Sequence, residues 1–142
     1  MRRILTAGAV VLAAALLAGC GPHYMPAAGS PPTTGGQLQT ATESDSGKTL
    51  NVHVGDRLEL KLSSTYWMVH GSSNPQVLRA EGPAVVSPQP GCVPGAGCGT
   101  VDVVFDVVGR GSADVTASRN SCGEAMGCTG STGSYRVTVV AT

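Results

Sequence analysis

Hydrophobic and polar residues alternate between Lys48 and Thr142, which is the pattern of β-strands that bury one face. The alternation is clearest in RLELKL, where Leu58, Leu60 and Leu62 share one face of the predicted strand. The predicted strands are, in chain order, residues 50–54, 57–62, 65–69, 76–81, 84–86, 101–108, 112–119 and 135–140. Turn-forming glycine, proline, serine or asparagine separates most of these segments.

Seven or eight short strands joined by turns predict an all-β fold, namely a β-sandwich, with a small β-barrel as the alternative. The core is expected to consist mainly of Val, Leu and Ala, because aromatic residues make up only 4% of the chain. Trp67 is expected in this core, where its ring fills space that smaller side chains leave open. We take residues 48–142 as the folded domain.

The first twenty residues have the order of a bacterial export signal. Arg2 and Arg3 precede an apolar run, residues 4–17, that is too short to span a bilayer comfortably. The sequence LAGC, ending at Cys20, then resembles the bacterial lipobox. The resemblance implies that the signal peptide, residues 1–19, is removed and that Cys20 carries lipid. An ordinary signal peptide with a chance cysteine is the alternative.

The segment from Cys20 to Gly47 is rich in Gly, Pro, Ser and Thr and has no hydrophobic periodicity. Such a composition buries too little apolar surface to order a chain. We therefore expect residues 20–47 to form a disordered tether between the lipid and the folded domain.

Four further cysteines form two C-x5-C pairs in glycine-rich segments, and an even number in an exported chain indicates disulfides. The spacing is wider than that of zinc-binding pairs, and neither pair has the C-x-x-C spacing of redox centres. The short separation favours Cys92 with Cys98 and Cys122 with Cys128. A bridge between the two loops, such as Cys92 with Cys128, remains open.

Each of these local disulfides would close a loop between two predicted strands. Loops held by a rigid scaffold often carry binding residues, and an ordered loop loses less entropy when it binds. The bonds could equally serve only to protect long loops from proteolysis. Both interpretations stay open at this point.

The order of VGDRLELKLSS, TYWMV, GAGCGTVDVVFDVVGRGSADVTASR and YRVTVVA, over about residues 51–141, resembles the chagasin-type inhibitors of papain-like cysteine proteases. The resemblance implies an immunoglobulin-like antiparallel β-sandwich in which three loops at one end form the inhibitory edge. By position it carries over Gly95 and Gly97 of the second loop and Arg119 of the third.

Two loops depart from the family pattern. Its first loop holds an Asn-Pro-Thr-Thr-Gly segment, whereas here Leu62 leads through three short polar residues to Tyr66. Its third motif is Arg-Pro-aromatic, whereas here Arg119 is followed by Asn120 and Ser121. The residues that we expect in the binding loops are Ser63, Ser64, Thr65, Gly95, Gly97, Arg119 and Glu124.

Other chemistry finds little support in the sequence. Nine basic and nine acidic residues balance, so no net charge attracts nucleic acid. His23, His53 and His70 have no nucleophile nearby in the sequence. Asp102 and Asp106 lie about 13 Å apart along one strand, too far for a pair of catalytic carboxylates.

These observations predict a non-enzymatic lipoprotein, anchored in the cell membrane through Cys20 on its extracytoplasmic side, whose disulfide-closed loops bind a protein. A papain-like protease is one candidate partner, in which case the chain is an inhibitor. A structural envelope lipoprotein without a discrete ligand is the remaining alternative. We expect no cofactor, no metal and no nucleic acid partner.

Overall fold

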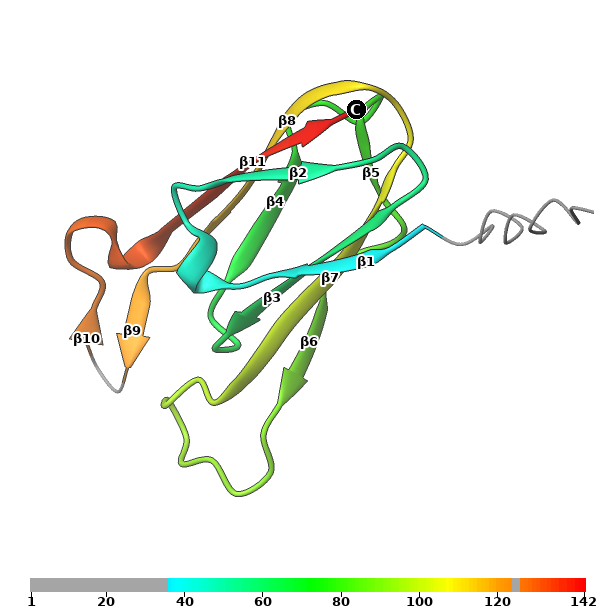
Figure 1. The fold of residues 1–142 in the computed structure, drawn as a ribbon. Helices are drawn as coiled ribbons and strands as arrows, with labels where there is room; N and C mark the ends of the chain where they lie inside the picture. The colour runs from blue at the N-terminus through cyan, green and yellow to red at the C-terminus, as the bar shows by residue number, and fades with distance from the viewer. Residues whose placement is uncertain (1–35, 124–125) are drawn as a thin grey trace, which may run out of the picture. The chain divides into compact units, whose positions relative to one another are not determined.

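The computed structural model describes residues 36–123 and 126–142 (Figure 1). The predicted signal peptide, Cys20 and the tether up to Gly35 lie outside this range, as does Glu124. The elements are β1 (Leu38–Ala41), η1 (Glu43–Asp45), β2 (Thr49–Val52), β3 (Arg57–Ser63), β4 (Met68–Ser72), β5 (Leu78–Ala80), β6 (Val85–Pro88), β7 (Gly99–Val107), β8 (Gly111–Ser118), β9 (Ser121–Gly123), β10 (Met126–Gly127), η2 (Gly130–Gly133) and β11 (Ser134–Ala141). No helix within the described residues is long and apolar enough to cross a membrane.

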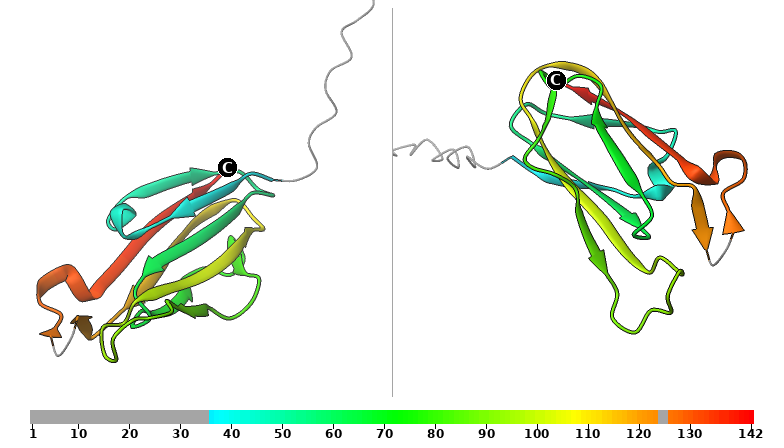
Figure 2. Two further views of the ribbon diagram at one scale, coloured as in Figure 1. Left: turned by 90° about the horizontal axis from the view of Figure 1, so that it is seen from below. Right: turned by 180° about the vertical axis from the view of Figure 1, so that it is seen from behind.

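Two sheets form the domain, as the views in Figures 1 and 2 show. One has the order β1-β3-β7-β5, with β6 also paired to β7, and the other has the order β2-β11-β8-β4. Strands β9 and β10 form a separate small hairpin. The all-β sandwich expected from the sequence is therefore confirmed.

The core lies between the two sheets and follows the two-residue period of the sequence. Every second residue of β3 and β7 is buried, and Leu58, Leu60, Leu62 and Phe105 have no exposed surface. Trp67 is 6% exposed and belongs to the same cluster, as expected. Burial of a large aliphatic or aromatic side chain contributes about 1.5–3 kcal/mol, so this alternation supplies much of the folding free energy.

Two strand pairs are parallel, which differs from the expected antiparallel arrangement. Strand β1 runs parallel to β3, and β2 runs parallel to β11, while the other pairs are antiparallel. The described residues also form eleven strands rather than seven or eight. The additional strands are short and lie at sheet edges or in the β9–β10 hairpin, where little apolar surface is buried and the hydrophobic pattern is weak.

The tether boundary expected at Gly47 is wrong, because β1 and η1 lie within residues 20–47. Leu38 pairs with Arg57 and Ala41 pairs with Leu60. Ala41 is fully buried and is the only buried residue of β1, so backbone hydrogen bonds rather than an apolar pattern hold this strand in place. Among the described residues, the first strand of the fold therefore begins at Leu38.

Asp56 fixes the start of this N-terminal strand. Its carboxylate accepts hydrogen bonds from the backbone N–H groups of Gln37, at 2.9 Å, and His53, at 2.8 Å. These bonds, with the nearby imidazole of His53, hold the pKa of Asp56 below its usual value. The turn at Gly55 and Asp56, between β2 and β3, is therefore hydrogen-bonded to the residue that precedes β1.

We predict that a chain starting at Lys48 is about 2–4 kcal/mol less stable than one starting at Gly36. The shorter chain loses the β1 ladder and the burial of Ala41, and each ladder hydrogen bond contributes about 1 kcal/mol net. Urea unfolding followed by Trp67 fluorescence measures the difference. A chain starting at Gly21 is the control and should match the chain starting at Gly36. Equal stability of all three chains would contradict a structural role for β1.

Candidate functional site

Three connections meet at one end of the sandwich (Figures 1 and 2). They are the turn between β3 and β4 (64–67), the loop between β6 and β7 (89–98) and the segment between β8 and β11 (119–133). We call this end the three-loop edge. The β3–β7 pairing creates it, because its register ends at Ser63 opposite Thr100 and so places the first connection beside the second.

The loop between β6 and β7 contains the disulfide Cys92–Cys98, with the two Cα atoms 5.8 Å apart. Within this ring, the N–H of Ala96 donates a hydrogen bond to the carbonyl of Val93 at 3.2 Å. Pro94 occupies the second position of this turn, and Gly95 the third with φ +86°, which is the signature of a type II β-turn. Closing so short a ring stabilises the fold by about 2.4 kcal/mol in the chain-entropy description.

Two hydrogen bonds join the β3–β4 turn to this ring, and a third joins the turn to Gly99 at the start of β7. The N–H of Ser64 donates to the carbonyl of Gly99 at 2.7 Å, and the N–H of Thr65 donates to the carbonyl of Gly97 at 2.9 Å. The hydroxyl of Tyr66 donates to the carbonyl of Gly95 at 2.6 Å. The two connections therefore form one hydrogen-bonded unit rather than two independent loops.

Close packing explains two of the glycines in this unit. A Cβ at Gly97 would lie 2.3 Å from Cε2 of Tyr66, and one at Gly99 would lie 2.2 Å from the carbonyl oxygen of Ser87. Ser64 is the one non-glycine residue of the described chain with a positive φ, at +112°. Its unfavourable backbone conformation is held in place by its own hydrogen bond to Gly99 and by that of Thr65 to Gly97.

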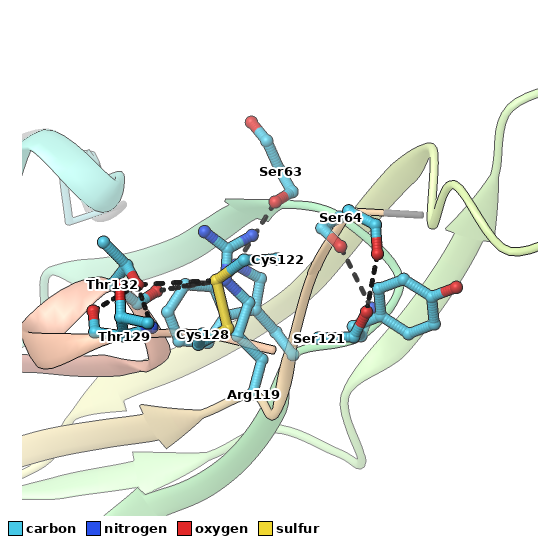
Figure 3. Close-up of a disulfide and its surroundings, with 11 residues drawn as sticks. Ser63, Ser64, Arg119, Ser121, Cys122, Cys128, Thr129 and Thr132 are labelled. Carbon is cyan, nitrogen blue, oxygen red and sulfur yellow. Dashed lines mark hydrogen bonds between the residues drawn. A yellow bond between two sulfur atoms is a disulfide. The ribbon is translucent and has the colours of Figure 1, made fainter. Parts of the chain in front are cut away.

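The third connection contains the disulfide Cys122–Cys128, with its Cα atoms 5.0 Å apart (Figure 3). The N–H of Cys128 donates to the carbonyl of Asn120 at 3.0 Å, within the β9–β10 hairpin. Thr129 and Thr132 close the following η2 turn through the hydroxyl of Thr132, which donates to the carbonyl of Thr129 at 2.7 Å. Both disulfides are the local pairs that the spacing favoured.

Arg119 connects the third loop to the core rather than extending into solvent. Its guanidinium carbon lies 4.5 Å from the ring centre of Trp67, and its Nε donates to the carbonyl of Thr132 at 3.2 Å. Figure 3 shows the side chain turned back over the protein. Trp67 in turn donates from Nε1 to the carbonyl of Ser63 at 3.2 Å. Arg119 therefore positions the third loop against the first.

A cleft of about 520 Å³ opens beside this contact. Its walls include Glu43, Trp67, Arg119 and Tyr135. The hydroxyl of Tyr135 is buried without a hydrogen-bond partner among the described residues. Burial, together with the carboxylates of Asp45 and Glu43, raises the pKa of Tyr135 above its ordinary value, so the phenol stays neutral at physiological pH.

The structure brings most of the predicted binding residues together at the three-loop edge. Ser63 and Gly95 are exposed there, while Ser64, Thr65 and Gly97 are partly covered by the contact between turn and ring. Arg119 faces inward, and Glu124 lies outside the described residues. Their role in binding remains a prediction.

Sequence reasoning missed the contribution of Tyr66 and the exposed turn of the first ring. The hydrogen bond from Tyr66 to Gly95 joins residues 29 positions apart, and no local sequence pattern predicts it. The turn could have been found, because Pro94 followed by Gly95 is the composition that a type II turn requires.

The histidines give no catalytic arrangement among the described residues. The hydroxyl of Ser118 does lie 2.8 Å from Nε2 of His70, a neighbour that the sequence did not indicate. The pair is exposed on adjacent strands, β4 and β8, and His70 forms no ion pair within the described range. His53 is exposed beside Asp56, and the same part of the chain holds no cluster of three or more potential metal ligands.

No family model and no curated protein matches the sequence. Solved structures do match the fold. The cysteine protease inhibitor EhICP2 of Entamoeba histolytica aligns with a TM-score of 0.53 and 11% identity, over 75% of this chain and 96% of that one. Amebosin aligns with a TM-score of 0.52 and 14% identity, over 76% of this chain and 100% of that one.

This chain shares the fold of a cysteine protease inhibitor. The immunoglobulin-like sandwich expected from the resemblance to chagasin-type inhibitors is thereby confirmed. At this level of identity the likeness concerns the fold.

We predict that Gly97→Ala destabilises the domain by about 2–4 kcal/mol and Gly95→Ala by about 1 kcal/mol. Both substitutions place a side chain at positive φ, but only Gly97 adds a collision with Tyr66, whereas Gly95 faces open space. Urea unfolding of both variants measures the difference. In a chain that already carries Tyr66→Ala, Gly97→Ala should lower the free energy of unfolding no more than Gly95→Ala does. Equal losses at the two glycines would contradict the packing described.

Proposed function

We propose that this chain is a non-enzymatic, membrane-anchored protein that binds a papain-like cysteine protease through its three-loop edge. The observation that carries the proposal is the hydrogen bonding between loops at this edge, where Tyr66 and the β3–β4 turn bond to the Cys92–Cys98 ring. The fold shared with EhICP2 supports the choice of partner class.

The loop-to-loop contacts favour a binding surface over simple cross-links. A disulfide that only protects its own loop from proteolysis needs no contact with a neighbouring loop. Here the ring and the turn are packed so closely that Gly97 cannot be replaced without a collision, and Ser64 adopts an unfavourable conformation. Order maintained in the free protein reduces the entropy lost on association, which increases affinity.

Two of the three connections, the β3–β4 turn and the loop between β6 and β7, carry no charged side chain, which indicates what kind of surface they contact. Residues 62–78 and 82–101 contain no Lys, Arg, Asp or Glu. Long-range electrostatic steering therefore contributes little to association. Affinity at such an edge depends on shape complementarity and on the burial of apolar area, as in compact protease–inhibitor interfaces.

Membrane anchoring is part of the proposal and is supported by the sequence. The order of Arg2, Arg3, an apolar run and LAGC ending at Cys20 is that of a lipoprotein signal. A lipid on Cys20 would hold the domain on the extracytoplasmic side of the membrane. Mass spectrometry of the mature N-terminal peptide checks this directly, because a lipidated Cys20 has a characteristic added mass.

We predict that the purified chain, residues 21–142, inhibits papain at nanomolar to micromolar concentration and that Ser63→Arg weakens this inhibition at least tenfold. Ser63 is exposed at the edge, where a long charged side chain would obstruct the contact. Inhibition constants from a peptide substrate assay provide the measurement.

His53→Arg is the matched control. It adds the same side chain at an exposed position near the opposite end of β3, where Arg57 begins the strand, and should leave inhibition unchanged. Failure of the wild-type chain to inhibit papain and related proteases would refute the protease as partner. Equal inhibition by both variants would refute the edge as the contact surface.

A further inference from the structure

The tip of the first ring is an exposed apolar feature of the three-loop edge. Val93 is 56% exposed, and Pro94 and Gly95 are exposed as well. Figure 1 shows that the loop between β6 and β7 extends well beyond the turn between β3 and β4. An outside surface that approaches this end of the sandwich therefore meets the ring before it meets the short first turn.

The tip is held in one conformation by three independent constraints. The disulfide Cys92–Cys98 closes its base, and the turn hydrogen bond from Ala96 to Val93 spans its end. The hydroxyl of Tyr66 then bonds to the carbonyl of Gly95 from the neighbouring turn. An exposed loop with this degree of order presents Val93 to solvent at little conformational cost to a binding partner.

The surroundings of the tip specify the chemistry that it fits. The two connections that form this part of the edge carry no Lys, Arg, Asp or Glu. A single exposed valine needs no explanation in itself, since isolated apolar residues are common on protein surfaces. An exposed valine and proline on a rigid, uncharged, projecting turn can bury their apolar area in a depression of a partner at little entropic cost.

We propose that Val93 and Pro94 anchor the three-loop edge by entering an apolar depression on a protein partner, with Tyr66 as the positioning residue. The inference rests on the proposed function in so far as the edge binds a protein, and it names the element that inserts. The first ring takes this role because the β3–β4 turn (64–67) is only four residues long. This turn lies nearer to the sheets than the tip of the ring does (Figure 1).

Val93→Lys should weaken inhibition of papain by about 10–100-fold, because the apolar area of Val93 is no longer buried and the added ammonium group would have to be desolvated. Val85→Lys is the matched control, because Val85 is 60% exposed on β6 and lies outside the ring. The control should change inhibition by less than threefold. Similar melting temperatures for the two variants show that the fold is intact.

Tyr66→Phe keeps the ring and removes its hydrogen bond to Gly95. It should weaken inhibition by about 3–10-fold, and the loss should vanish when Val93 is already Lys. A positioning role predicts this non-additivity, whereas a direct contact of Tyr66 with the partner predicts that the two losses multiply.

A photo-crosslinking amino acid at position 93 or 85 of the full chain tests the anchor without assuming a protease. In the native cell envelope, position 93 should give a protein adduct that position 85 does not give, and Tyr66→Phe should reduce its yield. If position 93 gives adducts but the wild-type chain does not inhibit papain, the proposed protease partner is refuted and the anchoring role of Val93 and Pro94 is supported. Inhibition that survives Val93→Lys, or no adduct at 93 beyond that at 85, would overturn the anchor.

Discussion

The antiparallel pairing of β3 with β7 is the interaction on which the three-loop edge depends. It joins two strands with strict apolar alternation, and its register ends with Ser63 opposite Thr100. The β3–β4 turn and the Cys92–Cys98 ring therefore emerge side by side. Their hydrogen bonds are a consequence of this register, since a shift by one residue would also turn Leu60 and its neighbours away from the core.

Those parts of the fold that bury one strand face could be predicted from the sequence. Leu58 and Phe105 belong to segments with strict alternation, and both lie where the pattern places them. Strand β1 could not be predicted, because its single buried residue, Ala41, produces no periodicity. The local disulfides followed from spacing, whereas the bond between Tyr66 and Gly95 depends on the tertiary fold and has no sequence signal.

The two rings differ in how they are attached to the sandwich. The first is joined to its neighbouring turn by backbone and tyrosine hydrogen bonds, and it projects outward. The third connection, which contains the second ring, is joined to the core through Arg119, which lies over Trp67. A cation over an aromatic ring contributes about 0.5–2 kcal/mol, so Arg119 contributes to the position of this loop. The edge thus combines one projecting ring with one that is connected to the tryptophan.

The parallel arrangement of β1 and β3 has a mechanical consequence. The chain enters the domain at Leu38, which pairs with Arg57 at the end of β3 remote from the three-loop edge. In a chain that is anchored on its N-terminal side and held by a partner at this edge, tension runs along the β1–β3 ladder. The ladder hydrogen bonds are then loaded together in shear, so the domain resists extraction more strongly than it would if the strands separated one bond at a time.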